Sequence, residues 1–144
     1  MADTTKVIFL CTGNSCRSQM AEGFLNKVAD EKIKAFSAGV EPIGINPKAI
    51  KVMEEVGIDI SKQSSNAIDI DFLEEMDYVI TLCDSAAKHC PIPPRSVKKL
   101  HWPIDDPADF NGTEKEVLDE FRRIRDEIEK KVKNFIQHFN KELC

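Results

Sequence analysis

A cysteine and an arginine bracket a short polar loop near the start of the sequence. Cys11 follows an apolar run over residues 7–10, and Arg17 stands six positions later, where an apolar pattern of helical spacing begins. A loop that opens a helix points its backbone N–H groups into one small space, and the helix dipole adds positive potential there. Such a space binds a tetrahedral oxyanion and stabilises a thiolate. The stretch therefore predicts an anion site with a nucleophile built into it.

The residues predicted to bind the oxyanion are Thr12, Gly13, Asn14, Ser15, Cys16 and Arg17. Glycine lets the loop backbone come close to the anion, and asparagine tolerates unusual turn dihedrals. The structural alternative is that Cys11 is a small hydrophobic residue at the end of a buried strand and that Arg17 is a surface charge. The complete spacing, a cysteine, five residues and then Arg-Ser between a strand and a helix, favours the anion site.

Cys83 and Cys90 lie seven positions apart, around a segment over 84–89 that is predicted to form a short helix. A helix would hold their Cα atoms roughly 10 Å apart, whereas a disulfide needs Cα atoms within about 7 Å. A disulfide between them would therefore require the segment to unwind, a change of shape that a partner could read. Two alternatives stay open: a pair of core cysteines, or a zinc site with His89 and His101, although the spacing differs from common zinc knuckles.

An acidic loop follows Trp102. Asp106 precedes Pro107, which holds it away from helical dihedrals. The carboxyl group could be fixed over the anion loop and give or take a proton there. Alternatively, Asp105 and Asp106 form only a turn and a helix N-cap.

Alternating strands and helices must position these residues. Strands are predicted over 7–10, 33–38, 78–82 and 97–101, and helices over 17–29, 47–56, 68–76, 84–89 and from 113 towards the C-terminus. This order predicts an α/β fold, a four-stranded parallel sheet with helices on both faces. Ligands of such sheets bind at the carboxyl ends of the strands. Cys11 and Cys83, each at the end of a strand, are therefore predicted on the same edge.

Composition restricts the function classes. A chain of 144 residues is expected to form a single domain over 1–144. A net charge of −5 argues against a nucleic-acid or membrane-surface partner. The apolar run near the N-terminus is too short for a signal peptide or a membrane span, so a cytoplasmic location is expected. Five cysteines there indicate catalysis, redox exchange or metal binding rather than a static disulfide framework.

Together these motifs resemble the thioredoxin-coupled arsenate reductases, which share the flavodoxin-like three-layer fold of the low-molecular-weight protein tyrosine phosphatases. The anion loop alone would be shared with the phosphatases, whereas the loop together with Cys83 and Cys90 is specific to the reductases. The matching stretches are Cys-Thr-Gly-Asn-Ser-Cys-Arg-Ser-Gln-Met-Ala-Glu-Gly at 11–23, Ser-Ala-Gly at 37–39, Val-Gly-Ile-Asp-Ile-Ser at 56–61, Thr-Leu-Cys at 81–83, Cys-Pro at 90–91, His-Trp at 101–102 and Asp-Asp-Pro at 105–107.

The resemblance implies a three-thiol relay that reduces arsenate to arsenite. Cys11 attacks arsenate held by the loop and Arg17, and Asp106 acts as the general acid. Cys83 then attacks Cys11 and arsenite leaves. Cys90 attacks Cys83, and the resulting disulfide is reduced by thioredoxin; a glutaredoxin or a small thiol could substitute as the donor. Two thiols that become one disulfide supply the two electrons that arsenic gains.

The resemblance also assigns supporting residues. Ser18 donates to the sulfur of the nucleophile, no cofactor is required, and a monomer is expected. Some relatives hold a potassium ion beside the loop, and the aligned ligands are Asn14, Glu22, Ser37, Ser64 and Asn66. Here Ser64 and Asn66 stand where Thr and Asp are familiar, and a lost carboxylate weakens a site for a hard cation. Cys16 is expected to be structural and Cys144 incidental.

Two other functions remain as alternatives. A tyrosine phosphatase would use Cys11, Arg17 and Asp106 alone, but Ala108 and Asp109 stand where phosphatases of this fold usually have aromatic residues. An open mouth suits a small inorganic oxyanion better, with residual phosphatase activity expected. A non-enzymatic thiol switch would need only the two later cysteines, and it would leave the anion loop without a purpose.

Overall fold

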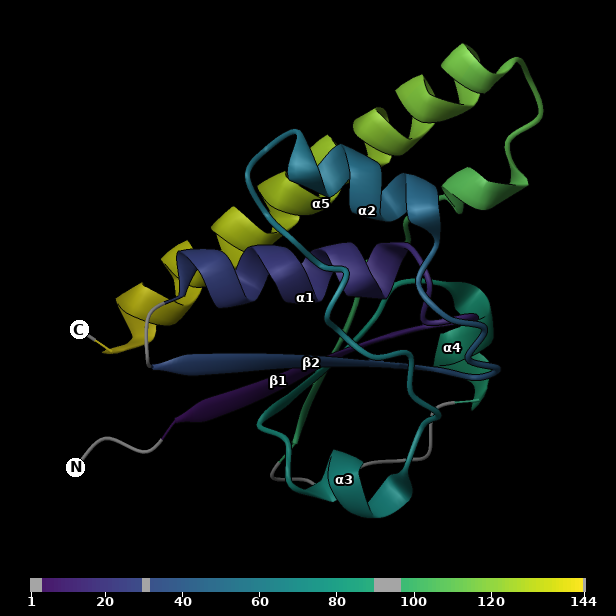
Figure 1. The fold of residues 1–144 in the computed structure, drawn as a ribbon. Coiled ribbons are helices and arrows are strands. Elements are labelled where there is room, and N and C mark those ends of the chain that lie inside the picture. The colour runs from purple at the N-terminus through teal and green to yellow at the C-terminus, as the bar shows by residue number, and fades with distance from the viewer. Residues whose placement is uncertain (1–3, 30–31, 90–96, 144) are drawn as a thin grey trace.

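A parallel four-stranded sheet forms the centre of the fold (Figure 1). The computed structural model describes residues 4–29, 32–89 and 97–143, so Cys90 and Cys144 lie outside the described residues. The strands are β1 Thr5–Cys11, β2 Ile33–Gly39, β3 Tyr78–Thr81 and β4 Lys98–His101. In the sheet they lie side by side in the order β2-β1-β3-β4. All three strand pairs are parallel. The predicted four-stranded parallel sheet is confirmed.

Helices cover both faces of this sheet (Figure 1). They are α1 Arg17–Val28, α2 Pro47–Glu54, α3 Ile70–Glu74, α4 Asp84–His89 and α5 Glu114–Leu143, with a 3-10 turn at Pro107–Asp109. Among the described residues, no helix is both long enough and apolar enough to cross a membrane.

Strand β1 is buried from both sides, and its side chains point alternately into two separate hydrophobic cores. Val7 and Phe9 pack with α1, α2 and α5 on one face. Ile8 and Leu10 pack on the other face against α3 and Ala86 of α4. Side chains of successive strand residues point to opposite faces, so an apolar run of this kind fits a strand covered by helices on both sides.

Side chains cap the N-termini of α2 and α5. Asn46 caps α2, as its side chain accepts the N–H of Lys48 at 2.8 Å. Thr113 and Glu116 form a capping box at the start of α5, each side chain accepting the other residue's backbone N–H.

Two predicted helices are too long. The helix predicted over 47–56 ends at Glu54, because the chain turns through Gly57 at φ +81°. The helix predicted over 68–76 begins only at Ile70, because the side chain of Asp69 accepts the N–H of Asp71 and caps the helix there. A glycine turn thus ends α2, and a side-chain cap sets the start of α3.

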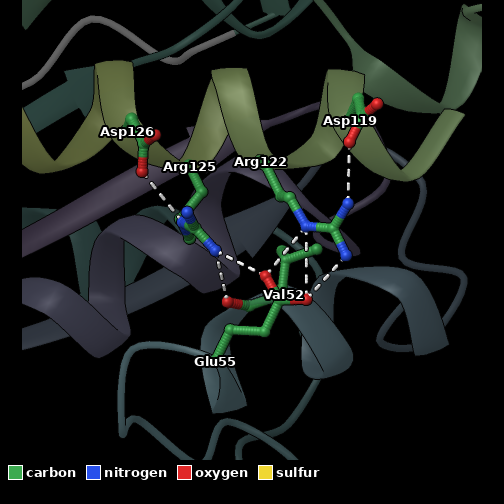
Figure 2. Close-up of polar contacts among 6 residues, drawn as sticks. All are labelled: Val52, Glu55, Asp119, Arg122, Arg125 and Asp126. Carbon is green, nitrogen blue, oxygen red and sulfur yellow. Dashed lines mark hydrogen bonds and ion pairs between the residues drawn. The ribbon is translucent and has the colours of Figure 1, made fainter. Parts of the chain in front are cut away.

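A carboxylate at the end of α2 is held by two arginines of α5 (Figure 2). Arg122 donates to Glu55 through Nε and Nη2, the shortest contact being 2.8 Å, and Arg125 donates through Nη1 at 2.9 Å. Arg125 also donates to the carbonyl oxygen of Val52. The hydrogen bonds from Arg122, followed by those from Arg125, lower the pKa of Glu55 to about 2. The contact ties α2, which follows β2 in the chain, to α5.

We expect Glu55→Gln to lower the free energy of unfolding at pH 7 by about 1 kcal/mol, since the carboxylate is partly exposed and solvent screens its ion pairs. A lowered pKa means that the carboxylate stabilises the fold above its ordinary value of 4.5 and loses that contribution as the pH falls towards about 2. Urea denaturation at pH 7 and at pH 3 measures both effects. The matched control is Glu54→Gln, the neighbouring exposed carboxylate. Equal losses in the two variants would contradict a specific role of Glu55.

Candidate active site

The loop over residues 12–16 lies between β1 and α1, and its carbonyl oxygens accept hydrogen bonds from other parts of the protein. The segment 40–46 donates four backbone N–H groups, at 2.8 to 3.1 Å, to the carbonyl oxygens of Cys11, Thr12, Gly13 and Ser15. The N–H groups of residues 12–16 donate to no other described residue. They are therefore free for an anion, and the N-terminus of α1 adds its dipole to them.

Two residues allow the backbone to take this course. Asn14 adopts φ +48°, in the left-handed region that asparagine tolerates better than most residues. Gly39, at the end of β2, lies directly against the loop. A Cβ atom there would sit 2.6 Å from the nitrogen of Asn14 and 2.8 Å from the oxygen of Thr12, so only glycine fits.

A chain of hydrogen bonds with a fixed direction ends on the sulfur of Cys11. The backbone N–H of Asn66 donates to Oδ1 of Asn14 at 2.7 Å. Nδ2 of Asn14 must then be the group that donates to Oγ of Ser18, at 2.8 Å. Since that oxygen already accepts a hydrogen bond, its own hydrogen is free to point at Sγ of Cys11, 2.8 Å away. A hydrogen bond donated to the sulfur favours its thiolate form.

Arg17 and Asp106 meet beside this sulfur. Arg17 is buried, and its guanidinium donates to the carbonyl oxygen of Ile104 at 2.9 Å and approaches Oδ2 of Asp106 at 3.4 Å. Oδ1 of Asp106 accepts the N–H of Ala108 and caps the 3-10 turn. The carboxyl group caps the 3-10 turn and also lines the cleft that contains Cys11, so the N-cap role does not exclude the predicted proton transfer.

Cys83 lies next to the same loop. Its sulfur is 3.3 Å from Oγ1 of Thr12 and accepts the N–H of Ala86 at 3.3 Å, at the start of α4. It lines a cleft with Thr12, Arg17 and Asp106, which also line the cleft of Cys11. The two cysteines therefore open onto adjoining clefts at the carboxyl edge of the sheet. The short helix predicted over 84–89 is present as α4.

Cys16 lines the cleft of Cys11 but is buried. Burial raises the pKa of its thiol to about 12, with smaller contributions in the same direction from Asp106 and Cys11. A thiol that keeps its proton is a poor nucleophile. This supports the structural role expected for Cys16.

The five residues aligned with potassium ligands lie together near the loop. Ser37 donates through Oγ to Oε1 of Glu22 at 2.6 Å, and burial raises the pKa of Glu22 to about 7. Nδ2 of Asn66 donates to the carbonyl oxygens of Ser37 and Ser64, and Asn14 accepts from Asn66 as described above. Among the described residues, no three side chains of His, Cys, Asp or Glu come together as a metal cluster.

The zinc alternative involves His89 and Cys90. Cys90 and the side chain of His89 lie outside the described part of the structure. His101, its fourth member, contacts Oγ1 of Thr81 at 2.7 Å through Nδ1 and approaches Asp84 at 3.4 Å through Nε2.

The sequence interpretation missed two side-chain amides, those of the buried Gln19 and the half-buried Gln63. Nε2 of Gln19 donates to the carbonyl oxygens of Asn14 and Ser64, and Nε2 of Gln63 donates to Oε1 and the carbonyl oxygen of Gln19. They join the loop to the segment around residue 64. A signal was present, because Gln19 precedes Met20 on the face of α1 that packs inwards, where a polar residue needs a partner.

The family model and the relatives that match this chain agree with one another. The model of the low molecular weight phosphotyrosine protein phosphatase family matches residues 6–144. Arsenate reductase of Bacillus subtilis is 53% identical over 131 residues, which cover 91% of this chain and 94% of the relative. Arsenate reductase of Staphylococcus epidermidis is 50% identical over 133 residues, 92% of this chain and 97% of the relative.

Solved structures agree with these relatives. An arsenate reductase in a phosphate-binding state has a TM-score of 0.75 and 38% identity, covering 94% of this chain and 98% of the other. A thioredoxin-dependent arsenate reductase of Corynebacterium glutamicum has a TM-score of 0.68 and 26% identity, covering 92% of this chain and 63% of the other. A low molecular weight protein tyrosine phosphatase from T. tengcongensis has a TM-score of 0.80 and 26% identity, covering 94% and 99%. Cys11 lies at the start of the loop between β1 and α1, and the matches agree with one another. The chain therefore belongs to the low molecular weight phosphotyrosine protein phosphatase family, among the members named arsenate reductase.

Proposed function

We propose that this chain reduces arsenate to arsenite through a relay of Cys11, Cys83 and Cys90, with thioredoxin as the final reductant. The observation that carries the proposal is the second thiol beside the anion loop, the sulfur of Cys83 at 3.3 Å from Oγ1 of Thr12. A phosphatase needs no thiol at this place. The names of the relatives support the substrate, and the thioredoxin-dependent reductase of Corynebacterium glutamicum supports the reductant.

Arsenate binding is electrostatic. The free N–H groups of residues 12–16 and the guanidinium of Arg17 surround the position above the sulfur of Cys11, where the charged oxygens of the anion would lie. These donors are fixed before the anion arrives, because the segment 40–46 already holds the loop carbonyls. Preorganised donors stabilise developing charge without paying for reorganisation during the reaction.

In the first step, the thiolate of Cys11 attacks arsenic and forms a sulfur–arsenic bond. An arsenate oxygen leaves as water after it takes a proton from Asp106, whose carboxyl group lies at the wall of the same cleft. The contact of Asp106 with Arg17 fixes the position of the acid. Arsenic is still As(V) in this adduct.

In the second step, Cys83 attacks the sulfur of Cys11. The sulfur–arsenic bond breaks, its electron pair stays on arsenic, and arsenite leaves as As(III), while the two sulfurs form a disulfide. In the third step, Cys90 attacks Cys83 and frees Cys11. This step requires α4 to unwind, and a helix of six residues has few internal hydrogen bonds to lose.

We expect Cys83→Ser to abolish arsenate reduction and to leave hydrolysis of a small aryl phosphate unchanged. The substitution removes the second thiol and keeps the anion loop, Arg17 and Asp106. The readouts are arsenite formation with thioredoxin, thioredoxin reductase and NADPH, and phosphate release in a separate assay. Cys144→Ser serves as the control for loss of a thiol. Equal loss of both activities in Cys83→Ser would contradict separate roles for the two thiols.

Cys90→Ser should support at most a single turnover, because the disulfide between Cys11 and Cys83 then cannot move to the surface. Rapid quench of enzyme in excess over arsenate gives the yield of the first turnover. Sustained turnover of this variant with thioredoxin would exclude the third thiol from the relay.

Ser18→Ala should slow alkylation of Cys11 by iodoacetamide at pH 7 by roughly 10- to 100-fold, the range expected for a hydrogen bond to a charged group. Arsenate turnover should fall with it. Ser15→Ala is the matched control, because its hydroxyl lies on the same loop but contacts Cys16, at 3.4 Å. Wild-type alkylation rates in Ser18→Ala would show that the hydroxyl does not stabilise the thiolate.

A phosphatase activity is the second candidate, and the match to the T. tengcongensis tyrosine phosphatase favours it. The cleft above Cys11 contains Ala108, Asp109 and Ile43, and no aromatic side chain among the described residues lines it. Without an aromatic wall, a phenyl ring gains little on binding. We therefore expect phosphatase activity to be secondary to arsenate reduction.

A further inference from the structure

The side-chain amide of Asn66 occupies a central place among the residues aligned with potassium ligands. Its Nδ2 donates to the carbonyl oxygen of Ser64 at 3.1 Å and to that of Ser37 at 3.3 Å. Its Oδ1 accepts from Oγ of Ser64 at 3.1 Å. A backbone carbonyl oxygen can only accept, so the amide must present its nitrogen to the two carbonyls. Two carbonyl oxygens of the aligned group are thus already satisfied by an N–H donor.

Two further oxygens of this group are also engaged. Oδ1 of Asn14 accepts the backbone N–H of Asn66, and Oε1 of Glu22 accepts from Ser37. Glu22 is the only carboxylate among the five aligned residues. A cleft beside the group is lined by Glu22, Ser37, Ser64 and Asn66, and Asp69 also lines it, but Oδ1 of Asp69 caps α3. Hard cations favour sites rich in carboxylate oxygens, and this set of donors does not fit one well.

We propose that Asn66 replaces the cation in this chain, so that the protein neither binds nor needs potassium. The amide ties together the carbonyl oxygens of Ser37 and Ser64. The backbone N–H of the same residue fixes Asn14, which orients Ser18 towards Cys11. The inference concerns ion binding and does not depend on the proposed reduction of arsenate.

An aspartate at position 66 would reverse this situation. A carboxylate oxygen would face the two carbonyl oxygens with no hydrogen to donate, and like partial charges at this distance repel. A cation between them would remove the repulsion. Since Asn66 is exposed to solvent, water moderates the effect, and we expect the variant to fold.

The experiment compares wild type with Asn66→Asp by thermal unfolding in potassium, sodium and choline chloride at equal ionic strength. The wild-type Tm should not depend on which cation is present. The Tm of Asn66→Asp should be lower in choline and should rise by roughly 3 °C or more in potassium, selectively over sodium. Asn111→Asp, the same change of charge at an exposed position outside the cleft, controls for general effects of charge.

A potassium-specific rise in the wild-type Tm would overturn the proposal. So would an Asn66→Asp protein as indifferent to potassium as wild type, because residue 66 would then not decide binding. A direct measurement on wild type, thallium(I) NMR with potassium as competitor, keeps the test decisive if the variant does not fold. A bound thallium signal displaced by potassium would overturn the proposal, and the lack of one would support it. Neither readout needs arsenate, so failure here is distinguishable from failure of the relay.

Discussion

The candidate anion-binding loop depends on one constraint. Its own carbonyl oxygens must point away from the side on which an anion would bind. Each peptide unit carries a donor and an acceptor, and a loop that presents both to an oxyanion gains little from either. Here the segment 40–46 takes the carbonyls of residues 11–13 and 15, and the N–H groups are left for the ligand. The close packing of Gly39 against Asn14 and Thr12 makes this arrangement possible. The loop, β2 and the segment after β2 therefore form one functional unit.

The sheet brings together chemistry that is far apart in the sequence. β1 and β3 are parallel neighbours, so Cys11 and Cys83, 72 positions apart, emerge at the same edge. α4 begins at this edge and places the sulfur of Cys83 beside Thr12. The fold alone suits a phosphatase as well as a reductase. In the proposed relay, the second thiol distinguishes the two functions.

Local signals in the sequence predicted most of the fold, because alternation, capping residues and turn glycines act within a few residues. The alternation of strands with helices and the short helix after Cys83 belong to this class. Contacts between distant polar residues could not be predicted in the same way. Glu55 meets arginines 67 and 70 positions later, and its own neighbours in the sequence give no sign of them. The bonds of Gln19 to residue 64 depend on a loop whose path periodicity does not specify.

The contact between the sulfur of Cys83 and the N–H of Ala86 links electron transfer to backbone structure. In the proposed relay, the atom that closes the first turn of α4 is also the atom that becomes oxidised. The redox midpoint of the later cysteine pair must then include the free energy of folding six residues into a helix. Solvents that strengthen helices would make the reduced protein a weaker electron donor, and a chain with a poorer helix former in this segment would give up its electrons more readily.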